Sequence, residues 1–366
     1  MNQRLQQLTK WMKQSSIEGA FITSTENVFY LSGFYIEPHE RLVGLAVFPD
    51  NEPFLICPSM EVPEAKKAGW SGEVIGYTDT DRPWDFIEKQ VKSRIPNIHS
   101  WAIEKEHLNV ERYEEMVNRF TGARFVSAEE KLQELRMVKD ASEMQKLRKA
   151  AEIADFAIQT GVNAIAEGVT EQEIIAAIEY EVKKKGISQM SFSTTVLAGA
   201  NAASPHGNPG QTKIKKGDFV LFDLGVVYEG YCSDITRTVA FGEISPEQEK
   251  IYQTVLDAEE TAIKAVKPGV LASELDLTAR KIIEDAGYGS YFPHRLGHGL
   301  GISVHEYPSL TETNNLAIRE GMVFTIEPGI YMQNVAGVRI EDDVYVTKDG
   351  VEVLTKFPKS LQIIKP

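Results

Sequence analysis

Two aspartates stand on either side of a short glycine-containing turn, at a spacing that could bring two carboxylates together. Asp223 ends the apolar run that begins at Gly217, and Asp234 follows the turn at 228–230. Both arms are rich in β-branched and aromatic residues, which predicts a β-hairpin over 217–238. Because side chains alternate between the faces of a strand, a register shift of two residues still leaves both carboxylates on one face. Like charges so close repel each other, so the pair indicates either a bridging cation or a solvated turn, and these residues alone favour neither.

A segment rich in histidine and glycine offers a second type of metal ligand. The range 292–305 contains His294, His298 and His305, and glycines stand on both sides of His298. Glycine allows the backbone to approach closely to whatever the imidazole binds. Oxygen and imidazole ligands together favour Mn, Fe, Co or Zn over Ca. A single histidine is more often a packed residue, so a metal site here depends on the joint pattern with the carboxylates.

Other glycine- or histidine-based sites lack their motifs. The glycines of 297–301 do not have the spacing of a dinucleotide-binding fingerprint, and no Gly-Lys-Ser/Thr lies near them. The chain has neither a Gly-x-Ser-x-Gly elbow nor a His-Glu-x-x-His helix. Phosphate-loop, serine hydrolase and thermolysin-like sites are therefore disfavoured.

Two glutamates further along the chain occupy strand-like positions. Glu327 ends the run 323–327, which is stopped by Pro328. In the next run, alternation places Arg339 and Glu341 on one face.

The region after residue 140 repeats itself with a period of about a hundred residues, far longer than a solenoid repeat. The matching positions are Gly168 and Gly269, Glu173 and Glu274, Gly186 and Gly287, the histidine loops 204–209 and 303–308, and Asp223 and Glu327. We infer two fused halves, each with helices, a histidine loop and a strand that ends in a carboxylate. A pseudo-two-fold relation would match Asp223 with Glu327, and Asp234 with Glu341, at the centre of one antiparallel sheet.

Helix signals support these halves. Asp140 and Glu143 form a capping box that opens a long helix, and Thr170 is expected to cap the next helix. Ser245, followed by Pro246, is the expected start of the first helix in the second half.

The first part of the chain has a different organisation. Strand-like runs alternate with amphipathic segments, the first of them a helix over 1–14, which indicates an α/β layer domain. The predicted strands are 20–23, 43–48, 54–57, 74–77, 101–104 and 124–127. We therefore predict an α/β domain over 1–127, a charged helical linker over 128–140 and a second domain over 141–366. The expected role of the first domain is an oligomer contact or one wall of a cleft.

Composition excludes several classes of partner. The net charge is −14 and no basic block is present, which argues against a nucleic-acid or anionic-membrane partner. No apolar run approaches the length of a membrane span. With only two cysteines, Cys57 and Cys232, a disulfide framework is not expected, and a reducing cytoplasm is the predicted location.

The order and context of five residues resemble the "pita-bread" metallopeptidase family, which comprises methionine aminopeptidase, aminopeptidase P and prolidase. The five are Asp223, Asp234, His298, Glu327 and Glu341. The first domain, with Asn27-Val-Phe-Tyr-Leu-Ser-Gly33 near its start, resembles the creatinase-like domain of the proline-specific branch. The resemblance covers essentially the full chain. It implies an α+β pita-bread catalytic domain, with duplicated halves around a central antiparallel sheet, preceded by an α/β creatinase-like N-terminal domain.

The resemblance also implies a role for each site residue. The five positions would ligate two divalent metal ions, with Mn the first choice and Co, Zn or Fe as alternatives. Paired cations offset the repulsion of the carboxylates and lower the pKa of a bridging water, so that hydroxide exists near neutral pH. Glu327 would also be the proton shuttle, and His305 and His294 would stabilise the oxyanion and position the substrate. His206, Tyr331 and Arg339 would lie on the substrate side, with an ion pair that orients a ligand as an equal alternative for Arg339.

The activity implied first is hydrolysis of Xaa-Pro dipeptides, as in a prolidase. An aminopeptidase P, which removes the first residue from longer Xaa-Pro peptides, shares every ligand and is the nearest alternative. Methionine aminopeptidase fits less well because it does not typically have the creatinase-like domain. A pita-bread module that binds peptides without catalysis is the alternative from another class. The expected partners are short proline-containing peptides, and the family implies a homodimer.

Overall fold

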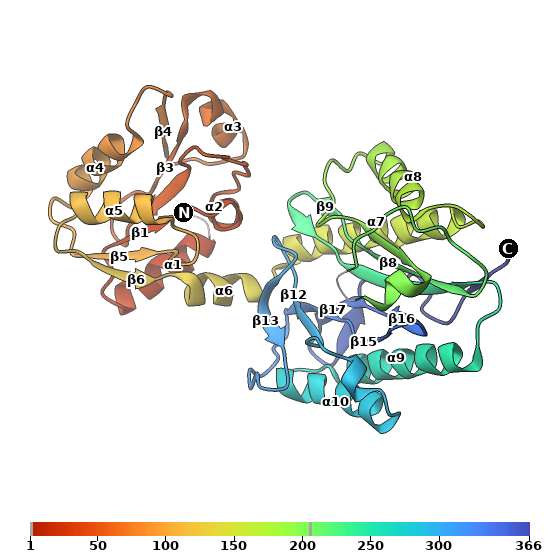
Figure 1. Cartoon of the computed structure of the whole chain (residues 1–366). Helices are drawn as coiled ribbons and strands as arrows, with labels where there is room; N and C mark the ends of the chain where they lie inside the picture. The colour runs from red at the N-terminus through yellow and green to blue at the C-terminus, as the bar shows by residue number, and fades with distance from the viewer. Residues whose placement is uncertain (1–2, 205–206) are drawn as a thin grey trace. The chain divides into compact units, whose positions relative to one another are not determined.

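The chain separates into two compact units, which are described in a computed structural model over residues 3–204 and 207–366 (Figure 1). The first unit runs from Met1 to Arg136 and the second from Met137 to Pro366. Each unit has its own hydrophobic core. The narrower limits predicted from the sequence, 1–127, 128–140 and 141–366, stay a prediction.

The first unit is built on a six-stranded mixed sheet. All six predicted strands are present: β1 (Gly19–Ile22), β2 (Gly44–Val47), β3 (Phe54–Pro58), β4 (Glu73–Tyr77), β5 (Ser100–Ile103) and β6 (Arg124–Ser127). Their order is β4-β3-β2-β1-β5-β6, and only β2 runs antiparallel to its neighbours. The accompanying helices are α1 (Gln3–Gln14), α2 (Thr25–Ser32), α3 (Val62–Lys67), α4 (Pro83–Arg94), α5 (Val110–Arg119) and α6 (Glu129–Met137). The α/β layer predicted for this part of the chain is therefore confirmed.

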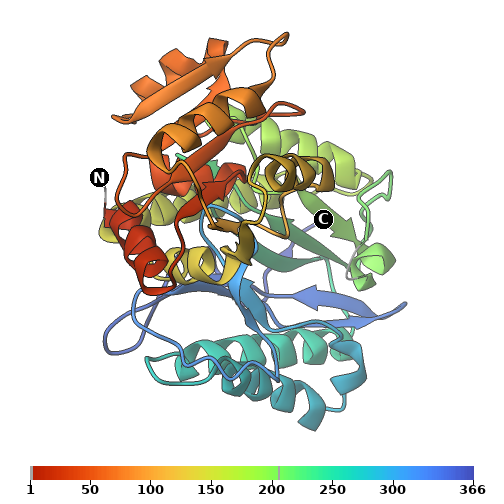
Figure 2. The ribbon, with the colours of Figure 1, turned by 90° about the vertical axis from the view of Figure 1, so that its left-hand side faces the viewer.

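The second unit contains two pairs of long helices, as the internal repeat predicts. They are α7 (Ala141–Asn163) with α8 (Glu171–Lys184), and α9 (Pro246–Ala265) with α10 (Ala272–Asp285). The predicted caps are present: Asp140 accepts from the backbone N–H of Glu143, Thr170 from that of Glu173, and Ser245 from that of Gln248. Figures 1 and 2 show α9 and α10 side by side, and α9 packs on strands of the second half.

The strands of this unit form two larger sheets and two short ladders. The first half contributes β7 (Thr195–Ala198), β8 (Asp218–Leu224), β9 (Val227–Tyr228), β10 (Tyr231–Cys232) and β11 (Ile235–Phe241). The second half contributes β12 (Gly297–Gly299), β13 (Glu306–Leu310), β14 (Val323–Ile326), β15 (Gly329–Met332), β16 (Ala336–Arg339), β17 (Asp342–Val346), β18 (Val351–Val353) and β19 (Ile363–Ile364). The sheet orders are β19-β11-β8-β7 and β13-β12-β14-β17-β18, and the ladders are β9-β10 and β15-β16.

The predicted central sheet is present in this divided form. Its two sheets meet at one backbone bridge, where the N–H of Glu341 donates to the carbonyl of Thr236 at 3.1 Å. This bridge joins the residue directly before β17 to the start of β11. The site residues on the two halves are therefore brought together across a junction of sheets.

The predicted hairpin is present but interrupted. β8 and β11 pair antiparallel, and their register places Asp223 opposite Thr236, two residues from Asp234. Alternation then keeps the two aspartates on one face, as expected. Between them the chain forms the separate β9-β10 ladder. Gly225 lies against the backbone of Ser233, where a Cβ atom would stand 1.8 Å from the carbonyl oxygen.

Candidate metal centre

The five predicted metal ligands come from both halves of the second unit. Asp223 lies in β8, and Asp234 precedes β11 directly. His298 lies in β12, Glu327 follows β14, and Glu341 stands between β16 and β17. Each carboxylate therefore sits at or near a strand end.

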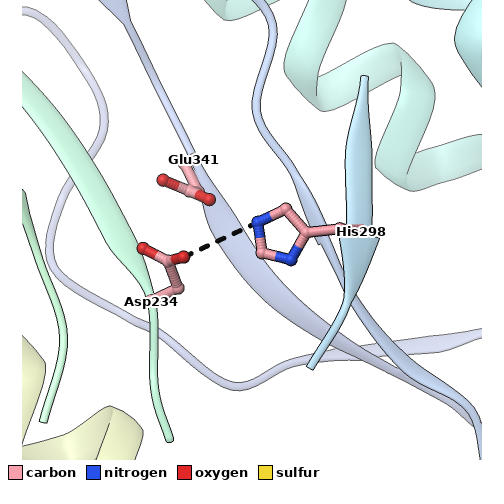
Figure 3. Close-up of side chains that lie close together, drawn as sticks. All are labelled: Asp234, His298 and Glu341. Atoms are coloured by element: carbon pink, nitrogen blue, oxygen red, sulfur yellow. Dashed lines mark ion pairs between the residues drawn. The ribbon is translucent and has the colours of Figure 1, made fainter. Parts of the chain in front are cut away.

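Three of these residues form a compact cluster. One ligand atom each from Asp234, His298 and Glu341 lies within 4.8 Å of the others, and all three residues are buried. Nε2 of His298 lies 3.7 Å from Oδ2 of Asp234 and 3.3 Å from Oε1 of Glu327. Figure 3 shows the carboxylates of Asp234 and Glu341 on the same side of the imidazole ring.

The imidazole of His298 is oriented by its second ring nitrogen. Nδ1 lies 3.1 Å from the carbonyl oxygen of Gly299, which can only accept, so Nδ1 carries the proton. Burial lowers the pKa of His298 to about 3, which keeps the ring neutral. The lone pair of Nε2 therefore points toward the carboxylates, as a metal-binding histidine requires.

The carboxylates repel one another in the absence of a cation. Burial raises the pKa of Asp234 well above its usual range, and the charges of Glu341 and Asp223 raise it further. Burial and the charge of Glu327 likewise raise the pKa of Glu341. Oδ1 of Asp234 is buried and has no hydrogen-bond partner among the described residues. A buried carboxylate oxygen without a donor, in a group of like charges with one imidazole, fits a divalent cation.

Asp223, a predicted metal ligand, is linked through Arg339 to Tyr331 and His294. The guanidinium of Arg339 forms an ion pair with the carboxylate of Asp223 and donates to the hydroxyl of Tyr331 at 2.7 Å. That hydroxyl lies 3.0 Å from Nε2 of His294. The ion pair expected as one alternative for Arg339 is thus present, and its contact with a substrate stays a prediction.

The remaining predicted residues are placed as follows. The ring of His305 stands edge-on to that of His298, with 4.2 Å between ring centroids and 81° between planes. Burial, followed by the charge of Arg295, lowers the pKa of His305. His206 lies outside the described residues.

Two threonines at the site were not identified from the sequence. Oγ1 of Thr236 accepts from Nε of Arg339 at 3.1 Å and donates to Oε2 of Glu341 at 2.6 Å. Oγ1 of Thr325 accepts from the backbone N–H of His298 and donates to Glu327, both at 3.2 Å. Each threonine stands two residues from a predicted ligand, so strand alternation was the signal that could have identified it.

Comparison with known proteins decides the family. Residues 145–348 match the model of metallopeptidase family M24, and residues 4–138 match that of the creatinase/prolidase N-terminal domain. The chain belongs to metallopeptidase family M24. All five predicted ligands lie inside the matched range, and this M24 member is a hydrolase of the metallopeptidase class. The resemblance to the proline-specific branch of the pita-bread fold is confirmed.

Individual relatives resemble the chain over nearly its full length. The "Putative dipeptidase YkvY" of Bacillus subtilis is 57% identical over 361 residues, which are 99% of each chain. The prolidase from Pyrococcus horikoshii has a TM-score of 0.91 and 36% identity, with 98% of this chain and 100% of that chain covered. The X-Pro aminopeptidase from Thermotoga maritima has a TM-score of 0.87 and 34% identity, with 95% and 98% covered. The fold alone therefore does not distinguish the two activities.

Proposed function

We propose that this M24 member is a metal-dependent Xaa-Pro dipeptidase. The observation that carries the proposal is the buried group of Asp234, His298 and Glu341, in a chain that matches a prolidase over 98% of its length. The protein would act on short proline-containing peptides. We also propose that it works in the cytoplasm as a homodimer and has no nucleic-acid or membrane partner. No helix in the described ranges is long and apolar enough to span a membrane.

The residues proposed to hold metal are Asp223, Asp234, His298, Glu327 and Glu341. When bound, two divalent cations would offset the buried carboxylates and lower the pKa of a water molecule at the site. Mn is the proposed metal, with Co, Zn or Fe as alternatives, because carboxylate oxygens and one imidazole accept each of these ions.

The other steps belong to side chains of the chain itself. Glu327 is proposed to take the proton of the attacking water and to deliver it to the leaving nitrogen of proline. Its Oε1 is held by the hydroxyl of Thr325 at 3.2 Å, which limits the directions that the carboxylate can face. His305 is proposed to donate to the developing oxyanion, and His294, held by Tyr331, to position the substrate.

The proline residue distinguishes this substrate from ordinary peptides. The bond before proline is a tertiary amide without an N–H group, so the substrate offers no donor at that atom. Recognition must then come from shape and from the groups around the bond. The proposed substrate-side residues are His206, Tyr331 and Arg339, of which the last two are buried together at the site.

Release of the first residue from longer Xaa-Pro peptides is the second candidate activity. The observation that favours it is the similarity to the X-Pro aminopeptidase at 34% identity over 95% of this chain. A non-catalytic peptide-binding module is a third and weaker candidate, because all five ligand positions carry acids or histidine.

Purified protein incubated with Mn and then desalted tests the proposal. We expect bound Mn in elemental analysis and hydrolysis of Ala-Pro, with much slower hydrolysis of Ala-Ala. Protein that carries no metal and cleaves neither peptide would refute the enzymatic function and favour the binding module.

A further inference from the structure

An ion pair is buried next to the loop that carries His305. Nζ of Lys139 lies 3.3 Å from Oε2 of Glu306, and the two side chains are only 1% and 5% exposed. Removing two charges from water costs several kcal/mol per ion, and attraction offsets this cost only when the geometry is good and further hydrogen bonds are made. Such a pair persists only where both side chains are held in place, so the contacts of each residue bear on what the pair orders.

Both members of the pair are fixed by the backbone. The N–H of Lys139 donates to the carbonyl of Gly321 at 2.8 Å, and the preceding residue, Val138, bridges to Met322 at the start of β14. Lys139 is therefore attached to the strand that leads to Glu327. On the other side, Oε1 of Glu306 accepts from the N–H of Ser303 at 3.0 Å, so the carboxylate holds its own loop closed.

Other contacts leave the loop little freedom. The N–H of Cys232 donates to the carbonyl of Gly301 at 2.7 Å, which ties the loop to the segment before Asp234. A Cβ atom on Gly301 would stand 2.8 Å from the carboxylate oxygens of Glu306, so glycine is needed for the carboxylate to lie there. His305, the residue before Glu306, reaches the ring of His298 from this loop.

We propose that Lys139 and Glu306 are positioning residues that hold His305 at the metal centre. The pair joins the segment just before β14 to the loop that carries His305. This connection would keep the imidazoles of His298 and His305 in one relative arrangement. Neither residue is proposed to touch the substrate. The inference rests on the proposed function only in that His305 is taken to act on the reacting bond.

A double-mutant cycle between Glu306 and His305 tests this inference. Glu306→Gln keeps the shape of the side chain and an acceptor for Ser303, but it removes the negative charge that pairs with Lys139. We expect kcat on Ala-Pro to fall roughly tenfold or more, with KM changed less than about threefold, because an oxyanion donor acts mainly in the transition state. In a His305→Ala background, Glu306→Gln should change kcat less than about twofold, since its effect passes through His305.

Conservative and remote variants separate positioning from general stability. Lys139→Arg keeps the charge and should retain most of kcat, whereas Lys139→Met should match Glu306→Gln. Glu260→Gln is the control, because Glu260 pairs with Lys264 at 3.1 Å on the exposed face of α9. It should leave kcat unchanged. If the effects of Glu306→Gln and His305→Ala multiply, or if Lys139→Met retains full activity, the inference is wrong.

Hydrogen exchange supplies a readout that does not depend on activity. In the Mn-incubated protein, Glu306→Gln should raise amide exchange in 301–306 relative to Glu260→Gln, while α7 to α10 stay protected. If the wild type cleaves no Xaa-Pro peptide, the proposed function fails and exchange alone decides the inference. Unchanged exchange in 301–306 would then overturn it. If Glu306→Gln does not fold, Lys139→Arg and Lys139→Met are compared in the same way.

Discussion

Thr236 shows how a single residue can orient a proposed metal ligand. Its hydroxyl accepts from Arg339 and donates to Glu341, so one small side chain aligns a guanidinium and a carboxylate. The same residue lies opposite Asp223 in the register of β8 and β11. Replacing a group that orients a ligand without binding metal is expected to lower activity or metal affinity about 10–100-fold.

Replacing this hydroxyl gives a matched pair of variants. Thr236→Val keeps the volume and removes both hydrogen bonds, and it should lower kcat/KM roughly 10–100-fold. Thr236→Ser keeps the hydroxyl and should stay within about threefold of wild type, since the hydrogen bonds are the relevant property. Kinetics on Ala-Pro and thermal unfolding of both variants provide the measurement. Equal losses in the two variants would contradict the role given to the hydroxyl.

Asp223 is a proposed metal ligand whose replacement should affect metal binding without changing the fold. Asp223→Asn removes the negative charge that pairs with Arg339 and is proposed to bind a cation, while the side chain keeps its size. We expect metal-dependent hydrolysis to be abolished and the far-UV circular dichroism to be unchanged. Calorimetric titration with Mn should show weaker binding than in wild type. Full activity in this variant would refute the ligand assignment.

At the scale of elements, close contact between strands determines where His298 stands. Gly297 in β12 lies so near β14 that a Cβ atom would be 1.9 Å from the carbonyl oxygen of Thr325. Because the neighbour is backbone, a rotamer change cannot relieve the clash. The position of the imidazole thus depends on a glycine beside it as well as on the histidine itself.

Gly297→Ala should therefore weaken both fold and site. We expect a loss of about 1–3 kcal/mol in the free energy of unfolding, as for overpacking of a core, together with reduced Mn binding. Gly350→Ala is the control, because a Cβ atom there meets nothing within 4 Å, and it should change stability by less than about 0.5 kcal/mol. Chemical denaturation measures the free energy of unfolding of both variants. Equal stability would contradict the close contact between Gly297 and Thr325.

Local patterns were sufficient to predict most elements. The capping residues Asp140, Thr170 and Ser245 begin helices where the sequence places them, because a side-chain oxygen next to an apolar stripe acts locally. The strands of the first unit were predicted from β-branched and aromatic runs for the same reason. The internal repeat also predicted that carboxylates from both halves would belong to one site.

Contacts between distant segments could not be predicted in this way. The two larger sheets meet at the bridge between Thr236 and Glu341, and within the interrupted hairpin Gly225 lies against the backbone of Ser233. The short strand β19 pairs in parallel with β11 across more than a hundred residues of chain, which no local pattern indicates. The same holds for the pair Lys139–Glu306, whose members look like ordinary surface charges in the sequence.

At the scale of the whole molecule, metal and stability should be coupled. Four carboxylates in the second unit lie close together, three of them with pKa values raised by burial. A cation that binds only the folded chain stabilises it by about 2.7 kcal/mol when its free concentration is a hundred times Kd. Chelation at constant pH should therefore lower Tm, and added Mn should restore it.

Calorimetry of chelated and Mn-loaded protein measures this coupling. The Asp223→Asn variant should show a smaller difference in Tm between the two states, which ties the effect to the site. A Tm that does not respond to chelation or to Mn in the wild type would contradict a metal centre built from these residues.

The relative turnover of Ala-Pro and Ala-Pro-Ala by the Mn-loaded protein tests the central claim most directly. Both peptides carry the same Ala-Pro bond, and they differ only in the alanine that extends the longer one beyond proline. An Xaa-Pro dipeptidase should cleave Ala-Pro with the higher kcat/KM and leave Ala-Pro-Ala nearly intact. Turnover confined to Ala-Pro-Ala would contradict the proposal and assign the chain the activity of an aminopeptidase P.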